Sequence, residues 1–516
     1  VLLALVACNK KSSPKVTTGG NTESGPLLSV QWHLVNMGQR GADNVPAKTG
    51  EDINLAPVMA SCTSDNCRGE GIRLVVVDDG LEIAHPEIAA NIASGASWNY
   101  ESGTNNPTNF PSDLESGHGT AVAGIVAARD SNSSDLRGVA PRVSLAGYAL
   151  LNNNNSANSA DAMSRNYLSV DISNNSWGPA DNTGILNGSP LVWREAIDLG
   201  VTQGRGGKGV VYLWAAGNGG AGGVDDSNYD GFANYKNVIA VSAVDAQGVR
   251  ASYSEPGANI LVAAPGGEFC DSLAITTIDR VGNAGFNSSE TAGGLETANT
   301  SYTRCMNGTS SATPMVAGVV ALMLQANPNL TWRDVRVLLA RSARKNHPAS
   351  PEWTTNGAGH DIHPTFGFGV VDANAAIIAA LGHTTNLPAL VTHSAPNPIT
   401  GLGLPILDNN PTGVTSDITV TGSNINSIEF VEVIVKATHA YSGDLEITLT
   451  SPNGTIRKLS GKRRCPGGCG NYDNWVFGVV QFLDEDADGT WTLGVKDLDQ
   501  SIQGTLDSWS LRIHGH

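Results

Sequence analysis

The feature that most constrains this chain is an apolar segment, Met315–Leu322, which directly follows the polar stretch Asn307–Pro314. Its residues are apolar on every side of a helix, so the helix that they predict has to be buried. Pro314 suits the first turn of that helix, where its missing N–H costs nothing. Ser310 is then expected at or just before the helix N-terminus, where free N–H groups favour developing negative charge. A serine there serves either as an ordinary N-cap or as a nucleophile that generates an oxyanion.

Three further segments place polar side chains at the ends of predicted elements. Leu74–Gly80 is a β-branched run that ends in carboxylates, as is typical of a buried parallel strand whose carboxyl end opens onto a crevice. Gly117–Val126 opens a small-residue helix with a histidine, and Val210–Gly219 is a second buried strand that ends in an asparagine. Each segment is a weak signal alone, but the order Asp, His, Asn, Ser at element ends predicts nucleophilic catalysis. The four candidates are Asp78, His118, Asn218 and Ser310.

With these motifs the chain resembles the subtilisin-like serine proteases, which carry a triad in the order Asp, His, Ser. The resemblance covers about residues 26–382 and implies an α/β fold with a doubly wound parallel sheet. It makes Ser310 the nucleophile, His118 the general base and later the general acid, and Asp78 the residue that orients the histidine. It also makes the side chain of Asn218 an oxyanion donor, beside the backbone N–H of Ser310.

The segment Ser173–Asp181 narrows the resemblance to the kexin/furin branch, because it is similar to the substrate-pairing strand of that branch and the turn after it. Val201–Gly209 is close to another signature of the same branch. The resemblance implies that Ser176, Trp177 and Gly178 contact the substrate.

Acidic positions of that branch imply a specificity for basic residues. Asp230 matches the acid that lines the S1 pocket, and Asp79 and Glu115 match acids that line S2. Carboxylates pair well with guanidinium and ammonium groups, so we expect cleavage after Lys-Arg or Arg-Arg.

Calcium is the cofactor that the resemblance implies. The acids matching those that hold Ca²⁺ below S1 are Asp181, Asp225 and Glu255, and hard oxygen ligands from separate loops suit this ion. A second calcium site of the family is in doubt, because Gly25 stands where an Asp is common, although Glu87 could still serve as its partner carboxylate.

Beyond about residue 406 the hydrophobic period changes from helical to alternating. Trp491, Leu493 and Val495 alternate with polar or small residues, which predicts an antiparallel β-sandwich. Residues 406–516 resemble the jelly-roll-like P domain of proprotein convertases, and the proline-rich stretch 383–405 is expected as a linker. Asp484–Gly489 mimics the start of an EF-hand loop, but its twelfth position is Val495, so a turn is predicted instead.

The N-terminal segment predicts export and anchoring. Residues 1–8 read as the remnant of a signal peptide that ends in a lipobox, with Cys8 as the lipidated residue, and residues 9–25 as a flexible tether. We therefore expect a bacterial outer-membrane lipoprotein; the alternative is an ordinary signal peptide with a stray cysteine. Little room for an inhibitory pro-domain lies between Cys8 and Gln31, so we expect folding to need a separate chaperone.

Charge and cysteine content limit the partners. The net charge of −17 argues against nucleic acid, and with no 18-residue apolar run we expect membrane contact only through the lipid on Cys8. Removing Cys8 from the seven cysteines leaves an even six, consistent with an oxidising compartment. Cys62 with Cys67 and Cys465 with Cys469 are close enough in the sequence to bracket short loops, and Cys270 and Cys305 remain as a third pair. The sequence does not fix this connectivity.

These observations predict a secreted, lipid-anchored, calcium-dependent serine endopeptidase of the kexin type that acts on proteins or peptides with basic P1 and P2 residues. Two alternatives stay open: a catalytically inactive lipoprotein that binds through its P domain, and a subtilisin of broad specificity.

Overall fold

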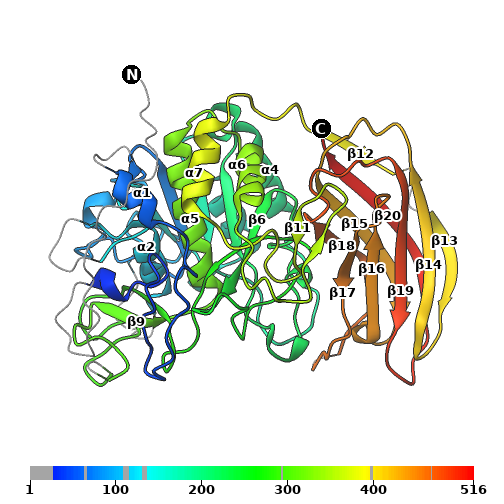
Figure 1. Ribbon diagram of the computed structural model, residues 1–516, viewed down its shortest axis with the longest axis horizontal. Coiled ribbons are helices and arrows are strands. Elements are labelled where there is room, and N and C mark those ends of the chain that lie inside the picture. Colours follow the sequence, from blue (N-terminus) through cyan, green and yellow to red (C-terminus); the bar gives the residue numbers. More distant parts are fainter. Residues whose placement is uncertain are drawn as a thin grey trace.

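The computed structural model describes residues 27–62, 67–108, 116–130, 136–291, 294–395, 399–466 and 468–516. An α/β body and an all-β body lie side by side (Figure 1). The predicted membrane anchor at Cys8, the tether, Gly25 and Glu115 lie outside the described residues.

The α/β body is built on a seven-stranded parallel sheet in the order β2-β3-β1-β4-β5-β6-β7. Its strands are almost entirely buried, as is typical of parallel sheets covered by helices on both faces. Strands β2 and β3 lie on one side of β1, and β4 to β7 lie on the other. The strand order therefore reverses between β1 and β4, and a doubly wound fold is expected to have its crevice at the carboxyl ends of these two strands. The strands are β1 (Arg73–Asp78), β2 (Trp98–Asn99), β3 (Ser144–Ala149), β4 (Ile172–Asn175), β5 (Val211–Ala215), β6 (Val238–Val244) and β7 (Ile260–Pro265).

The central helix α5 (Thr309–Ala326) carries the apolar segment and is buried along nearly its whole length, as predicted. Pro314 is its sixth residue, so it lies in the second turn and not in the first. Of the described helices, α5 is also long and apolar enough to cross a membrane by length and composition, which we had not expected, but 83% of that window is buried inside the protein. Burial of that kind is what the core helix of a globular body shows.

The other helices cover the sheet and one of them starts with a reciprocal cap. In α6 the Thr331 side chain accepts from the N–H of Asp334 while the Asp334 side chain accepts from the N–H of Thr331. These helices are α1 (Ala56–Ser61), α2 (His118–Ala127), α3 (Ser156–Ser164), α4 (Leu191–Gly207), α6 (Trp332–Ser342) and α7 (Ala373–Gly382). Two small antiparallel sheets complete this body: β8 (Ile275–Ile278) pairs with β9 (Tyr302–Met306), and β10 (Thr354–Thr355) pairs with β11 (Asp361–Ile362).

The all-β body is an antiparallel sandwich of a five-stranded and a four-stranded sheet. Side chains of β19 alternate between core and surface as predicted, with Trp491, Leu493 and Val495 fully buried. The first sheet contains β12 (Val391–Ser394), β13 (Ile399–Ile406), β15 (Ile428–His439), β18 (Tyr472–Val479) and β20 (Gly504–Gly515), and the second contains β14 (Asn410–Val420), β16 (Leu445–Thr450), β17 (Ile456–Ser460) and β19 (Gly489–Asp497).

Much of the stretch expected as a linker belongs to this sandwich. Both β12 and β13 pair with β20, so the sandwich begins before residue 406. Prolines suggested a linker here, but edge strands tolerate proline, and Pro405 lies opposite Thr505 in such a pairing.

The two bodies share a buried and charged interface. The carboxylate of Glu429, in the sandwich, pairs with two arginines of α6, Arg333 and Arg336, and lies 3.5 Å from Arg336. The Glu429 side chain is fully buried between the two bodies. Asp484, the first residue of the EF-hand-like stretch, instead pairs with Arg341 at 2.7 Å and with His360 at 2.8 Å. The stretch is therefore a turn that docks onto the α/β body, as opposed to a calcium loop.

Within the described residues, three disulfides join the cysteines: Cys62–Cys67 and Cys465–Cys469, which proximity in the sequence suggested, and Cys270–Cys305, the remaining pair.

Candidate active site

A pocket of about 290 Å³ opens at the carboxyl ends of the central strands. It is lined by three of the four candidate catalytic residues, His118, Asn218 and Ser310. The fourth, Asp78, is the last residue of β1, is fully buried, and contacts the pocket through His118. The topology thus gathers residues that lie up to 232 positions apart in the sequence, from Asp78 to Ser310.

Asp78 and His118 form a close pair, with 2.8 Å between Asp78 Oδ1 and His118 Nδ1. Burial raises the pKa of the Asp78 carboxyl, and the neighbouring charge of His118 opposes that rise. Burial would lower the pKa of His118, but the charge of Asp78 and its hydrogen bond outweigh it and raise this pKa to about 9. His118 is therefore held with Nδ1 toward the carboxylate, which leaves Nε2 as the nitrogen able to take a proton from a reacting group.

Ser310 is the second residue of α5 and is 8% exposed. Its hydroxyl donates to the carbonyl oxygen of Ser176 at 3.2 Å, and within the described residues no hydrogen bond joins it to His118. Hydrogen bonds between nucleophile and base are often long without substrate, so this geometry is that of a resting site. The N–H of Ser310 lies in the first turn of α5, where backbone donors have no partner within the helix.

Asn218 is fixed by the residue that precedes Ser310. Its side-chain oxygen accepts from the backbone N–H of Thr309 at 2.9 Å and from the Thr309 hydroxyl at 3.0 Å. Among the described residues the amide nitrogen of Asn218 has no hydrogen-bond partner, so it is available as an oxyanion donor. Sequence reasoning missed Thr309, although its position directly before the nucleophile was a signal.

Asp79, the predicted S2 residue, has a structural role next to the catalytic pair. Its carboxylate accepts backbone N–H groups at the start of α2, from Gly117 at 3.0 Å, His118 at 3.1 Å and Gly119 at 2.8 Å. Both oxygens are thus engaged in capping the helix that begins with His118. The lining of the pocket does not include Asp79 among the described residues.

The remaining expected contacts with substrate lie together in the pocket. Ser176, Trp177, Gly178 and Asp230 all line it. The ring of Trp177 also packs against Trp214, with 4.5 Å between ring centroids, so this side chain supports the pocket wall from the core.

The pocket is strongly acidic. Burial raises the pKa of Asp230 to about 7, and the backbone N–H of Phe232 donates to it at 2.8 Å. Burial also raises the pKa of Asp226, another residue that lines the pocket, to about 7. The sequence analysis did not identify Asp226, although it adjoins the predicted calcium ligand Asp225. Along the described part of the chain, neither lysine nor arginine lines the pocket. A cationic group is the partner that this environment lacks.

The three acids predicted to hold calcium also line the pocket. Asp225 accepts the N–H of Gly184 at 2.5 Å, Asp181 accepts that of Asn218 at 2.9 Å, and Glu255 accepts that of Gly219 at 2.9 Å. Burial, and then the charges of Asp225 and Asp181, raise the pKa of Glu255 well above its usual range.

The surroundings of these acids fit a hard cation. A Cβ at Gly219 would lie 2.1 Å from Asp225 Oδ2, and one at Gly217 would lie 2.3 Å from Glu255 Oε1, so glycine keeps this space open. Among described residues, the groups of three ligand atoms within 4.8 Å of one another do not include this trio, so its carboxylates would have to move closer together for all three to bind one Ca²⁺ directly. At the second possible calcium site, Glu87 accepts a hydrogen bond from the Tyr302 hydroxyl at 2.5 Å.

Comparison with known proteins agrees with this geometry. Residues 69–369 match the model of the Subtilase family, and residues 428–513 match that of the Proprotein convertase P-domain. Neuroendocrine convertase 2 of Bos taurus is 33% identical over 507 residues, which cover 95% of this chain and 74% of the convertase. Human proprotein convertase subtilisin/kexin type 4 is 33% identical over 497 residues, 95% of this chain and 60% of that protein.

A solved structure is similar over both bodies. The serine protease of Aeromonas sobria, solved in complex with the chaperone ORF2, superposes with a TM-score of 0.84 at 30% identity and covers 95% of both chains. The chain therefore belongs to the subtilase family of serine endopeptidases, and its catalytic body is followed by a proprotein convertase P-domain.

Proposed function

We propose that this protein hydrolyses peptide bonds with Ser310 as nucleophile, His118 as general base and Asp78 as the residue that orients the histidine. The observation that carries the proposal is the 2.8 Å contact between Asp78 and His118 beside a pocket that also holds Ser310 and Asn218.

In this mechanism the Ser310 hydroxyl leaves the Ser176 carbonyl and attacks the substrate carbonyl carbon while His118 Nε2 takes its proton. Asp78 stabilises the resulting imidazolium. The N–H of Ser310 and the amide nitrogen of Asn218 donate to the oxyanion. His118 then gives the proton to the leaving amine, and a water molecule, activated by the same histidine, releases the acyl group from Ser310.

A fluorophosphonate probe tests the nucleophile directly. We expect the probe to modify Ser310 in the wild-type protein and to leave Ser310→Ala unmodified. Modification of Ser311, the adjacent serine of α5, in place of Ser310 would contradict the assignment. Absence of labelling in a folded wild-type protein would favour the inactive, P-domain-binding alternative.

The proposed specificity is cleavage after basic residues, chiefly Lys-Arg or Arg-Arg. It is supported by the carboxylates that line the pocket and by the lack there of a cationic partner among described residues. Arginine is favoured over lysine because its planar fork binds carboxylates in a bidentate manner. A cleavage profile that preferred Phe or Leu at P1 would favour the alternative of a broad-specificity subtilisin.

The proposed cofactor is Ca²⁺, held by Asp181, Asp225 and Glu255. When bound, it neutralises the charges of these acids and stabilises the loops that form the pocket wall. The catalytic steps themselves belong to the residues named above.

Anchoring and assisted folding complete the proposal. Lipid on Cys8 would hold the protein at the outer membrane, so Cys8→Ser should move it from the detergent phase to the soluble phase. The similarity to a protease solved with a chaperone supports a separate folding partner. Efficient recovery of active enzyme from denaturant with no other protein added would contradict that part of the proposal.

A further inference from the structure

Three buried side chains with metal-binding atoms meet at one end of the sandwich: His439, Asp444 and Asp497. Their ligand atoms lie within 4.8 Å of one another. His439 is the last residue of β15 and Asp497 the last of β19, while Asp444 ends the 3₁₀ helix η7 (Ser442–Asp444) just before β16. Since β15 belongs to one sheet and β16 and β19 to the other, the cluster spans the two sheets.

The orientation of His439 leaves a lone pair facing a carboxylate. Its Nδ1 lies 2.8 Å from the carbonyl oxygen of Tyr441, whereas the N–H of Tyr441 is farther from the same nitrogen, at 3.3 Å. A carbonyl oxygen only accepts, so Nδ1 carries the proton. In the neutral ring Nε2 then has the lone pair, and it lies 3.2 Å from Asp497 Oδ2. A carbonyl oxygen that accepts the N–H of one ring nitrogen fixes the tautomer in which the other nitrogen can bind a metal.

Asp444 provides an independent observation. The residue is 6% exposed. No residue in the described segments donates a hydrogen bond to its carboxylate or forms an ion pair with it. The carboxylate oxygens are not among the fully buried polar atoms without a partner, so a solvent ion can reach them. Asp497, which is fully buried, adds a second carboxylate within 4.8 Å. With His439 neutral, the cluster holds two carboxylates, and the nearby Lys462 already pairs with Asp499 at 3.0 Å.

We propose that His439, Asp444 and Asp497 bind a divalent transition metal ion of the Zn²⁺ type. One imidazole nitrogen and two carboxylate oxygens suit such an ion, with water as the fourth ligand. The donor set differs from the oxygen-only site proposed at the pocket, which suits Ca²⁺. The ion joins the end of β15 to the ends of β19 and η7 and so fastens one sheet of the sandwich to the other.

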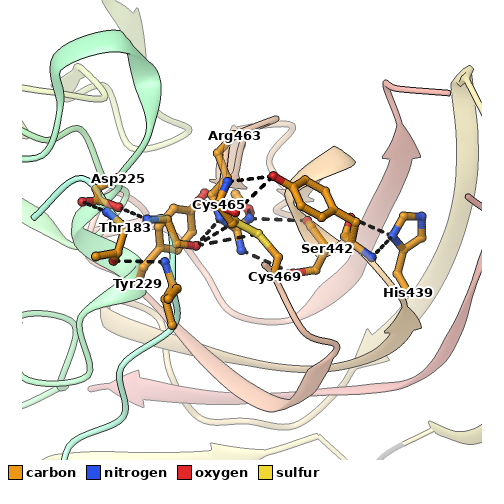
Figure 2. The surroundings of a disulfide bond; sticks show 12 residues. Thr183, Asp225, Tyr229, His439, Ser442, Arg463, Cys465 and Cys469 are labelled. Carbon is orange, nitrogen blue, oxygen red and sulfur yellow. Dashed lines mark hydrogen bonds between the residues drawn. A yellow bond between two sulfur atoms is a disulfide. The ribbon is translucent and has the colours of Figure 1, made fainter. Parts of the chain in front are cut away.

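The site is also connected to the pocket through Arg463, which Figure 2 shows near the Cys465–Cys469 disulfide. The N–H of Arg463 donates to the carbonyl of Gly443 at 2.7 Å, beside Asp444. The Arg463 side chain donates through Nε to the carbonyl of Gly184 at 2.8 Å, and the Gly184 N–H donates to Asp225 at 2.5 Å. Loss of the ion is therefore expected to loosen the sandwich first and the pocket wall second.

Zinc binding to the full chain tests the site, in a Ser310→Ala background that prevents self-cleavage. The protein is freed of metal, saturated with Ca²⁺ and titrated with Zn²⁺, and bound zinc is counted by equilibrium dialysis with elemental analysis. We expect one equivalent of Zn²⁺, a rise in the unfolding temperature, and a loss of affinity of at least about tenfold in Asp444→Asn. Asp473→Asn, which removes the same charge from an exposed position of the sandwich, is the matched control and should bind like the parent.

Equal zinc binding by the parent and Asp444→Asn, or no binding by the parent, would overturn the proposal. If Asp444→Asn does not fold, zinc-edge anomalous diffraction from parent crystals decides. A peak beside His439 Nε2 and the two carboxylates supports the site, and a peak only elsewhere, or none, refutes it.

Discussion

Ser176 and Ser310 exchange two hydrogen bonds: Ser310 Oγ donates to the Ser176 carbonyl at 3.2 Å, and Ser176 Oγ donates to the Ser310 carbonyl at 3.1 Å. The second bond is available because Pro314, four residues after Ser310 in α5, has no N–H to pair with that carbonyl. The proline in the second turn thus joins the helix that carries the nucleophile to the end of β4.

Removing the Ser176 hydroxyl tests this link. In Ser176→Ala the buried carbonyl of Ser310 loses its donor, which we expect to lower the free energy of unfolding by about 1–3 kcal/mol. Thermal and denaturant unfolding measure the loss. Ser159→Ala is a control, because this buried serine donates to a carbonyl of its own helix and its loss should cost less. Equal stability of Ser176→Ala and the wild type would show that the exchange contributes nothing.

The pH dependence of the reaction should reflect the Asp78–His118 pair. The pKa of His118 is raised from 6.5 to about 9, and only the unprotonated imidazole acts as a base, so kcat/KM should rise as the pH increases above 6.5 toward 9. Because the folded-state pKa is the higher one, the pair contributes stability that is complete below pH 6.5 and is lost as the pH rises through 9. Initial rates with one peptide across this range, with unfolding measured at each pH, check both. A flat profile from pH 6.5 to 9 would contradict the prediction.

Substitutions of Asn218 and of Thr309 should lower kcat by different amounts. Asn218→Ala removes the proposed oxyanion donor and should lower kcat by about 10²–10³-fold with a small change in KM. Thr309→Val removes only the hydroxyl that orients Asn218 and keeps the backbone N–H, so its loss in kcat should be much smaller. Steady-state kinetics on the two variants and the wild type give the comparison. A larger defect in Thr309→Val than in Asn218→Ala would contradict the proposed roles.

Asp230 should decide the preference for a positive P1 residue. Losing one partner of a buried charge pair costs about 3–5 kcal/mol, so Asp230→Asn should lower kcat/KM for a P1-arginine peptide by at least about 10²-fold. The matched peptide with P1 citrulline has nearly the same shape without the charge, and the variant should change its turnover little. Asp473→Asn controls for the loss of net charge. Equal effects of Asp230→Asn on both peptides would show that the carboxylate does not recognise the cation.

Calcium should stabilise the pocket wall. Titration of metal-free protein with Ca²⁺ is expected to raise the unfolding temperature, by the equivalent of about 2.7 kcal/mol at one hundred times the dissociation constant. Asp225→Asn should weaken this response, and Mg²⁺, which demands a smaller octahedral site, should replace Ca²⁺ poorly. An unchanged calcium response in Asp225→Asn would remove this residue from the ligand set.

The sequence predicted those parts of the fold that depend on local pattern. The all-round apolar character of α5 required burial, and the alternation of Trp491, Leu493 and Val495 required a strand with one face in the core. Polar residues at the ends of β1 and β5 were predicted to belong to one catalytic site, and the parallel pairing of β1 with β4 and of β4 with β5 brings these ends to the same edge of the sheet.

The parts that could not be predicted depend on contacts between distant segments. The carboxylate of Asp79 also caps the first turn of α2, and only the packing of α2 beside β1 shows this second role. The hydrogen bonds from Ser176 to Ser310 and from Thr309 to Asn218 cross between elements far apart in sequence. Composition misled us at β13, because proline marks edge strands as well as linkers.

Gly184 lies where the two bodies meet. Its φ is +65°, and a Cβ there would lie 2.4 Å from the carbonyl oxygen of Arg464 and 3.0 Å from Cys465 Sγ, so the disulfide-closed loop of the sandwich rests directly on this glycine. Figure 2 shows the loop beside Asp225 and Tyr229 of the catalytic body. Substitutions on either side of this contact must be compatible with the other, so the two bodies are expected to evolve as one unit. A chimera that carries the sandwich of a relative would alter substrate selection as well as stability.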